Sequence, residues 1–147
     1  MDIEIREAVD EDVEDLLRLY IDLELQEYKR MSKDMAKKML AKIRTYPEYK
    51  VFVAIYNGEA IGTFSLLILD GIPHNGEPSG LVEYVVTKKE YQGKGIGKAM
   101  MQYAMDYCRQ RRCFKLVLSS NIKREAAHRF YESLGFEKAG YSFAIKI

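Results

Sequence analysis

Within the first fifty residues, the spacing of apolar residues changes from every second residue, as in a strand, to the spacing of a helix. Ile3 and Ile5 fall on one face of a strand over residues 2–8. Asp10 is then expected to cap a helix over 11–27, whose first turn is acidic. The apolar positions of this helix are Val13, Leu16, Leu17 and Tyr20. A second helix is expected to begin at Ser32 and to stop before Pro47, and it contains Met35, Met39 and Ile43.

In the middle of the chain, the side chains follow the two-residue alternation that is typical of strands. Residues 51–56 and 59–69 flank Asn57-Gly58, which is the strongest short hairpin signal because both residues tolerate positive φ. The composition of residues 70–80 is typical of a loop, and residues 81–87 predict a strand apolar enough to be central. A glycine-rich turn and a third helix follow, with an inward face of Gly97, Met100, Met101, Ala104, Met105 and Cys108.

The last third predicts a strand over 114–119, a helix over 123–134 and a strand-like stretch over 136–147. Gly135 follows the helix where a left-handed residue commonly ends one. The expected order is strand, helix, helix, three strands, helix, strand, helix, strand. This order predicts a mixed, largely antiparallel α/β sheet, with a parallel strand–helix–strand crossover over 81–119. We expect one domain over 1–147.

Composition excludes several classes of protein. The 147 residues are 48% hydrophobic and 31% charged, which is typical of a globular domain. The 23 basic and 22 acidic residues argue against a dedicated nucleic-acid binder. The longest apolar run, 64–69, is too short for a membrane span, and residues 1–6 do not resemble a signal peptide. Cys108 and Cys113 match no metal spacing, so we expect a reduced, cytoplasmic protein without a metal.

The segment from Gln92 to Lys98, Gln-Gly-Lys-Gly-Ile-Gly-Lys, carries the clearest chemistry. Glycines before a helix let a ligand approach the backbone N–H groups, and the helix start favours an anion. The spacing is wrong for a nucleotide-binding P-loop, and Ala99 supplies no hydroxyl for magnesium. The glycines also fail the dinucleotide pattern GxGxxG. A phosphate site and a simple glycine-rich turn both remain open at this stage.

Two motifs resemble the GNAT N-acetyltransferases. Residues 82–98 resemble that family's motif A, whose core Gln/Arg-x-x-Gly-x-Gly/Ala is matched by Gln92, Gly95 and Gly97. Residues 127–136 resemble motif B, with Tyr131 four residues before Gly135-Phe136. The resemblance implies acetyl transfer from acetyl-CoA to a primary amine, by direct attack on the thioester and without a metal. The residues that it implies for binding acetyl-CoA are Val85, Val86, Thr87, Gln92, Gly93, Lys94, Gly95, Ile96, Gly97 and Lys98. Arg124 departs from the family's pattern, and we expect it either to contact CoA as well or to cap a solvated helix.

The reaction requires a base, an oxyanion donor and stabilisation of the departing thiolate. The resemblance implies Tyr131 as the acid, although a packed helix aromatic would give the same pattern. Glu83 is our candidate base, directly or through water, since a glutamate in an apolar strand is costly unless it is paired or used. A solvent-facing strand residue is the alternative. Many relatives carry asparagine where this chain has Arg124, and Asn121 lies three residues earlier. We expect His74 and His128 to be surface or packing residues.

The acceptor and the assembly stay open. Residues 10–27 are acidic, and Asp22, Glu24 and Glu27 suit a cationic amine or a solvated helix face, whereas residues 29–50 are basic. We expect a small-molecule amine, no nucleic acid and no membrane partner. A homodimer fits such domains but is not established by the sequence. The alternative function is a non-catalytic acyl-CoA sensor with the same fold.

Overall fold

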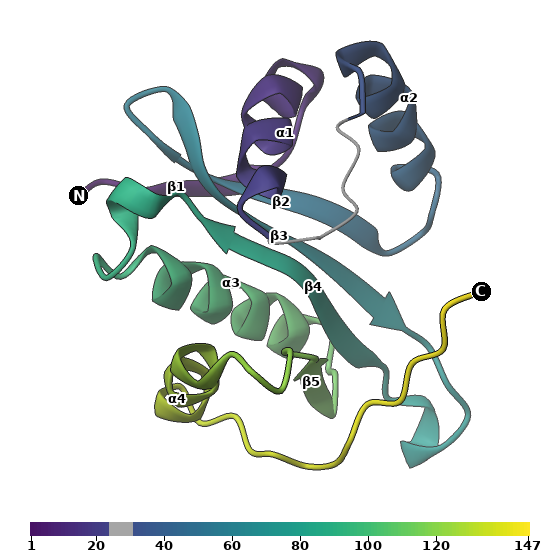
Figure 1. Ribbon diagram of the computed structural model, residues 1–147. Coiled ribbons are helices and arrows are strands. Elements are labelled where there is room, and N and C mark those ends of the chain that lie inside the picture. The colour runs from purple at the N-terminus through teal and green to yellow at the C-terminus, as the bar shows by residue number, and fades with distance from the viewer. Residues whose placement is uncertain (24–30) are drawn as a thin grey trace. The chain divides into compact units, whose positions relative to one another are not determined.

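Five strands form one sheet in the order β1-β2-β3-β4-β5 (Figure 1). The computed structural model describes residues 1–23 and 31–147, in two compact units, Met1–Val117 and Leu118–Ile147. The strands are β1 (Glu4–Glu7), β2 (Tyr49–Tyr56), β3 (Glu59–Leu69), β4 (Ser79–Thr87) and β5 (Lys115–Leu118). Strands β1 to β4 pair antiparallel, and β5 runs parallel to β4. The mixed α/β sheet predicted from the sequence is therefore confirmed.

Helices of the first unit cover both faces of this sheet (Figure 1). Helices α1 (Val13–Ile21) and α2 (Lys33–Ile43) lie on one face, where they pack on Val51 and Val53. Helix α3 (Ile96–Gln110) lies on the other face. A Cβ atom added to Gly62 on β3 would come within 3.0 Å of the Met100 sulfur, so this strand lies close against α3. The buried residues of α3 are Ile96, Met100, Met101, Ala104 and Cys108, while Gly97 and Met105 are half-buried.

Several expected turns are confirmed. Asn57 and Gly58 join β2 to β3 with φ of 50° and 77°, as a two-residue hairpin with the strand twist requires. Ser32 caps α2 by accepting the Met35 N–H at 3.2 Å. Short 3-10 turns, Asp10–Asp12, His74–Gly76 and Lys89–Tyr91, connect other elements.

The predicted start and end of the first helix are wrong. The chain forms a 3-10 turn over Asp10–Asp12 before α1, because the Asp12 carboxylate accepts the Val9 N–H at 2.8 Å. Asp12 rather than Asp10 lies at the N-cap position, and α1 ends at Ile21. Residues 24–27 of the predicted helix lie outside the described residues. Strand β4 starts at Ser79, two residues before the predicted position, and β5 is shorter than predicted.

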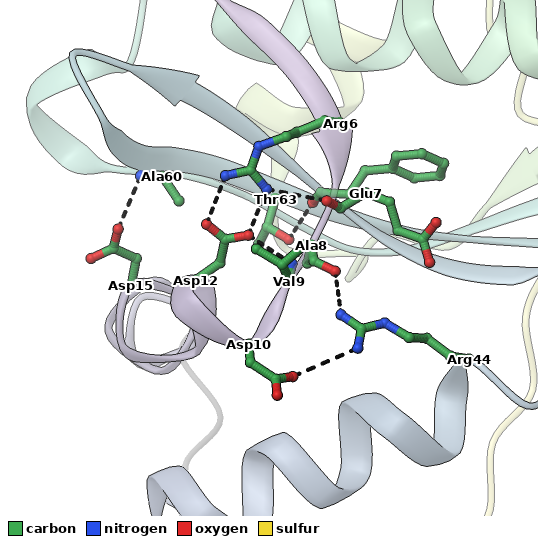
Figure 2. A network of polar contacts seen from close by, with 11 residues as sticks. Arg6, Glu7, Ala8, Val9, Asp10, Asp12, Asp15, Arg44, Ala60 and Thr63 are labelled. Atoms are coloured by element: carbon green, nitrogen blue, oxygen red, sulfur yellow. Dashed lines mark hydrogen bonds and ion pairs between the residues drawn. The ribbon is translucent and has the colours of Figure 1, made fainter.

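A polar network fastens β1 to the helices of the first unit (Figure 2). Arg6 binds both carboxylate oxygens of Asp12, at 2.7 and 3.0 Å. The Asp15 carboxylate accepts the Ala60 N–H at 3.0 Å, which ties α1 to β3. Arg44 donates to the Ala8 carbonyl at 2.7 Å, which ties the end of α2 to the end of β1. These contacts hold α1 and α2 over their face of the sheet.

The second unit contains helix α4 (Glu125–Ser133) and ends without a strand. Helix α4 is shorter than predicted, and Gly135 follows its C-cap with φ of 99°, as expected. The strand predicted over 136–147 is wrong, since these residues have no regular secondary structure. Phe143 is 94% exposed in this stretch. Alternation predicts which side chains share a face, but a strand also needs a partner backbone.

Candidate functional site

The pairing of β4 with β3 is interrupted at one place. Thr63 pairs with Val86 and Ser65 pairs with Glu83, so Phe64 alone faces Tyr84 and Val85. The extra residue makes a β-bulge, and Tyr84 has a left-handed φ of 54°. A bulge takes backbone groups out of the regular ladder, so β4 can offer an N–H group to a ligand here. The sequence carried no signal for it, because a bulge depends on the register with the neighbouring strand.

Glu83 lies directly before the bulge and is half-buried. Paired residues of antiparallel strands share a face, so Glu83 lies beside Ser65 on the face covered by α1 and α2. Ser65 is 2% exposed. Glu83 forms no ion pair with any residue in 1–23 or 31–147. The carboxylate is thus half-buried, and among the described residues no cation pairs with it.

Tyr49 of β2 and Tyr84 at the bulge lie near Glu83, and sequence reasoning did not propose them as site residues. The Tyr84 ring meets the Tyr20 ring of α1 edge to face, with 6.4 Å between centroids. Burial raises the pKa of Tyr49 above its ordinary value, and a hydrogen bond with Ser65 opposes that rise. Tyr49 pairs with Leu67 and Glu83 pairs with Ser65 of β3, so the two side chains lie at adjacent positions on the same face, and the charge of Glu83 raises the pKa of Tyr49 further. In the sequence, Tyr84 and Tyr20 were predicted only as apolar strand and helix positions, and Tyr49 lay before the predicted strand over 51–56.

The glycine-rich loop between β4 and α3 has an open backbone. Gly93 and Gly95 have φ of 74° and 87°, and a Cβ atom at either would meet nothing within 4 Å. The first backbone hydrogen bond of α3 runs from the Ala99 N–H to the Gly95 carbonyl at 3.0 Å. The amides before Ala99 are therefore available to an anion at the helix start. Lys94 and Lys98 are exposed in this segment.

Thr87 and Gln92 join this loop to the end of β4. The Gln92 amide donates to the Thr87 carbonyl at 3.2 Å. Val86 is buried in the core on the face of α1 and α2. Val85, Val86, Thr87 and the residues of the glycine-rich loop therefore form one continuous segment that follows Glu83 along the chain.

Tyr131 and Arg124 belong to the second unit. The Tyr131 ring packs against the Phe130 and Phe136 rings, with centroids 5.2 and 5.8 Å away. Burial raises the pKa of the Tyr131 phenol, and Arg124 opposes this in part. The phenol therefore stays protonated at neutral pH, as an acid must. Arg124 lies at the N-cap position of α4 and is exposed.

The histidines make structural contacts. His128 Nε2 lies 2.8 Å from the Asn121 carbonyl oxygen, and the Asn121 side chain accepts the Lys123 N–H at 2.9 Å. The His74 ring stacks on Phe114, with centroids 4.0 Å apart. These contacts agree with the packing roles expected for both histidines.

The acidic side chains proposed to attract the acceptor are only partly described. Asp22 lines a cavity of about 280 Å³ beside α1, with its carboxylate 3.9 Å from Lys89 Nζ. Glu24, Glu27, Lys29 and Arg30 lie outside the described residues. In residues 1–23 and 31–147 no helix is long and apolar enough to cross a membrane. Within the same ranges no three metal-binding side chains gather.

Comparisons with known proteins agree on the family. The family model described as acetyltransferase (GNAT) family matches residues 13–136. A glucosamine 6-phosphate N-acetyltransferase of Trypanosoma brucei brucei is 36% identical over 87 residues, 59% of this chain and 57% of that protein. An aminoalkylphosphonate N-acetyltransferase of Salmonella typhimurium is 29% identical over 95% of this chain and 88% of its own.

A solved structure, a putative acetyltransferase from Agrobacterium tumefaciens, resembles this chain with a TM-score of 0.92. It is 29% identical and the similarity covers 98% of this chain and 99% of that one. The family match spans both motifs and most of the described elements. The chain therefore belongs to the GNAT family of acetyltransferases.

Proposed function

We propose that this protein, acting as one domain over 1–147, transfers the acetyl group of acetyl-CoA to a primary amine. The β-bulge at Tyr84 and Val85 is the observation that carries the proposal. The bulge takes backbone groups of β4 out of the regular ladder beside the half-buried carboxylate of Glu83. The same strand leads into the open glycine-rich loop. Family membership and the names of the relatives support acetyl transfer over the alternative of a passive acyl-CoA sensor.

The glycine loop would hold the pyrophosphate of acetyl-CoA. Backbone N–H groups at the start of α3 suit its negative charge, and Lys94 and Lys98 add positive charge nearby. The pantetheine arm would lie along residues 85–87, as an extended amide chain that pairs with strand backbone. Arg124 would contribute a further positive charge. This arrangement would present the thioester carbonyl at the bulge.

The amine nitrogen would attack the thioester carbonyl carbon after Glu83, directly or through water, removes its proton. The carbonyl oxygen gains negative charge as the new C–N bond forms, and a backbone N–H at the bulge would stabilise it. The C–S bond then breaks, and the electron pair leaves with the CoA sulfur. Tyr131 would donate its phenolic proton to that thiolate. The products are an N-acetylated amine and CoA.

Thermal unfolding with acetyl-CoA, ATP or NAD tests the donor first. A ligand at 100 times its dissociation constant adds about 2.7 kcal/mol to the free energy of unfolding. We expect the Tm to rise by several degrees with acetyl-CoA alone, followed by amine-dependent release of thiol. A shift with ATP or NAD and none with acetyl-CoA would refute the assignment of the loop. Acetyl-CoA binding without thiol release for any amine would favour the sensor instead.

A further inference from the structure

Four tyrosines and Glu83 form a patch on the face of the sheet covered by α1 and α2. We call Tyr20, Tyr46, Tyr49, Tyr84 and Glu83 the tyrosine patch. Tyr20 meets Tyr84 at 6.4 Å, and Tyr46 meets Tyr49 at 6.0 Å between ring centroids. Tyr49 pairs with Leu67 of β3 and Glu83 pairs with Ser65 of β3, so Tyr49 and Glu83 occupy adjacent positions on this face and connect the two pairs. Tyr46 and Tyr84 are 49% and 51% exposed, so their rings are accessible to a small molecule.

The charged residues on either side of Tyr49 in the sequence point to the opposite face of the sheet. These residues are Glu48, which directly precedes β2, and Lys50 within β2, and side chains of a strand alternate between faces. Glu48 pairs with Arg111 of α3 at 3.1 Å, and Lys50 pairs with Glu7 at 3.3 Å. Glu83 has no ion-pair partner in the described ranges. The patch therefore presents one carboxylate among aromatic rings.

This chemistry selects a cation with an apolar body. An ammonium group gains from a carboxylate and from the faces of tyrosine rings. An alkyl or aromatic body gains from burial against the same rings. A phosphate or phosphonate group would instead meet the negative charge of Glu83, without a bidentate arginine partner in the patch.

We propose that the acceptor is a primary amine on an alkyl or aromatic body without phosphate, bound with its ammonium end at Glu83 and its body on the tyrosine patch. The inference rests on the proposed function, because the patch adjoins the bulge where the thioester would react. Tyr84 is then a residue that determines specificity through its ring. The proposed acceptor lacks phosphate, whereas the acceptors named for the Trypanosoma and Salmonella relatives carry phosphate or phosphonate.

Acetylation rates with three amines at saturating acetyl-CoA test the inference. The amines are 2-phenylethylamine, 2-aminoethylphosphonate and glucosamine 6-phosphate. We expect kcat/KM for 2-phenylethylamine to exceed both others by about tenfold or more, because only this amine adds an aromatic body to its ammonium group and carries no phosphate or phosphonate to repel Glu83. Equal rates, a preference for either phosphorylated amine, or no turnover of 2-phenylethylamine would overturn it.

Two substitutions at Tyr84 separate the ring from the backbone conformation. Tyr84→Asn removes the ring but keeps a residue that tolerates positive φ, and Tyr84→Phe keeps the ring. We expect Tyr84→Asn to raise KM for 2-phenylethylamine by about tenfold and Tyr84→Phe to change it by less than about twofold. KM for acetyl-CoA should stay the same in both. Tyr141→Asn, at a tyrosine that is 86% exposed in the second unit, is the matched control.

Failure of the inference is distinguishable from failure of the proposed function. If acetyl-CoA raises the Tm but the enzyme prefers phosphorylated amines, only the proposed acceptor class is overturned. Acetyl-CoA that neither binds nor reacts would overturn the proposed function and the inference together. An equal rise in KM for Tyr84→Asn and Tyr84→Phe would remove the ring from acceptor binding.

Discussion

Asp12 is a charged side chain that the fold buries, at 6% exposed, and its contacts explain why this is tolerated. Burial alone would raise the pKa of its carboxyl group. The hydrogen bond from Arg6 and the one from the Val9 N–H lower it, and the net pKa lies below the ordinary value of 3.8. The folded protein therefore favours the ionised form of Asp12.

Asp12→Asn should lower the free energy of unfolding by about 1–3 kcal/mol at pH 7, since Arg6 loses its charged partner. A carboxyl whose pKa is lowered by folding stabilises above its unfolded pKa. The advantage of the natural protein over the variant should therefore vanish as the pH falls below 3.8 and through the folded pKa. Urea unfolding at several pH values measures this. Asp106→Asn, at an exposed pair with Arg109, should change little.

Tyr131 is the residue on which the proposed departure of the thiolate depends. Tyr131→Phe keeps the ring contacts with Phe130 and Phe136 but removes the proton. We expect kcat to fall by about tenfold to a thousandfold, with the dissociation constant of acetyl-CoA unchanged. Stopped-flow thiol release and calorimetry measure the two quantities. Unchanged kcat would leave Tyr131 as a packing residue only.

At the scale of elements, the loop before α3 is open because two glycines take left-handed φ. Gly95→Val adds a branched side chain where the backbone is expected to meet pyrophosphate. We expect acetyl-CoA binding to weaken by about tenfold or more, through blocked approach and altered backbone conformation. Isothermal titration of acetyl-CoA measures it.

Gly58→Val is the matched control for this substitution. Gly58 also has a left-handed φ, of 77°, and open space around its Cβ position, but it lies in the β2–β3 hairpin. Both variants should lower the Tm through backbone strain, while only Gly95→Val should weaken acetyl-CoA binding. Equal weakening in both would mean that strain, rather than the loop, causes the effect.

At the scale of the whole molecule, elements far apart in the sequence pack against each other, so the volumes of their contacting side chains must fit. A Cβ atom on Gly80 of β4 would lie 2.5 Å from the Cys108 sulfur of α3. Gly80→Ala should therefore lower the free energy of unfolding by about 1–3 kcal/mol. Adding Cys108→Ala removes the clashing sulfur, so the double variant should lose less than the sum of the single variants. Additive losses in urea unfolding would contradict this packing.

The sequence predicted the elements wherever the signal was local. Asn57-Gly58 specified a hairpin, Ser32 a helix start and Gly135 a helix end, because each depends on the backbone conformation of a few neighbours. The motifs around Gly95 and Tyr131 gave the family, which the match over 13–136 confirms. The strand predicted over 136–147 failed because pairing needs a partner that alternation does not name.

Tertiary structure alone decided what surrounds the candidate base. Glu83 was visible in the sequence as a charge in an apolar strand, but its neighbour Tyr49 comes from β2, and the Tyr20 ring that meets Tyr84 comes from α1. The bulge at Tyr84 arises from the register of β4 against β3, which no local pattern encodes. The sequence by itself thus determined the family and the glycine-rich loop before α3, since these depend on contiguous residues. The proposed acceptor surface was decided by strand register and helix packing, which bring together residues far apart along the chain.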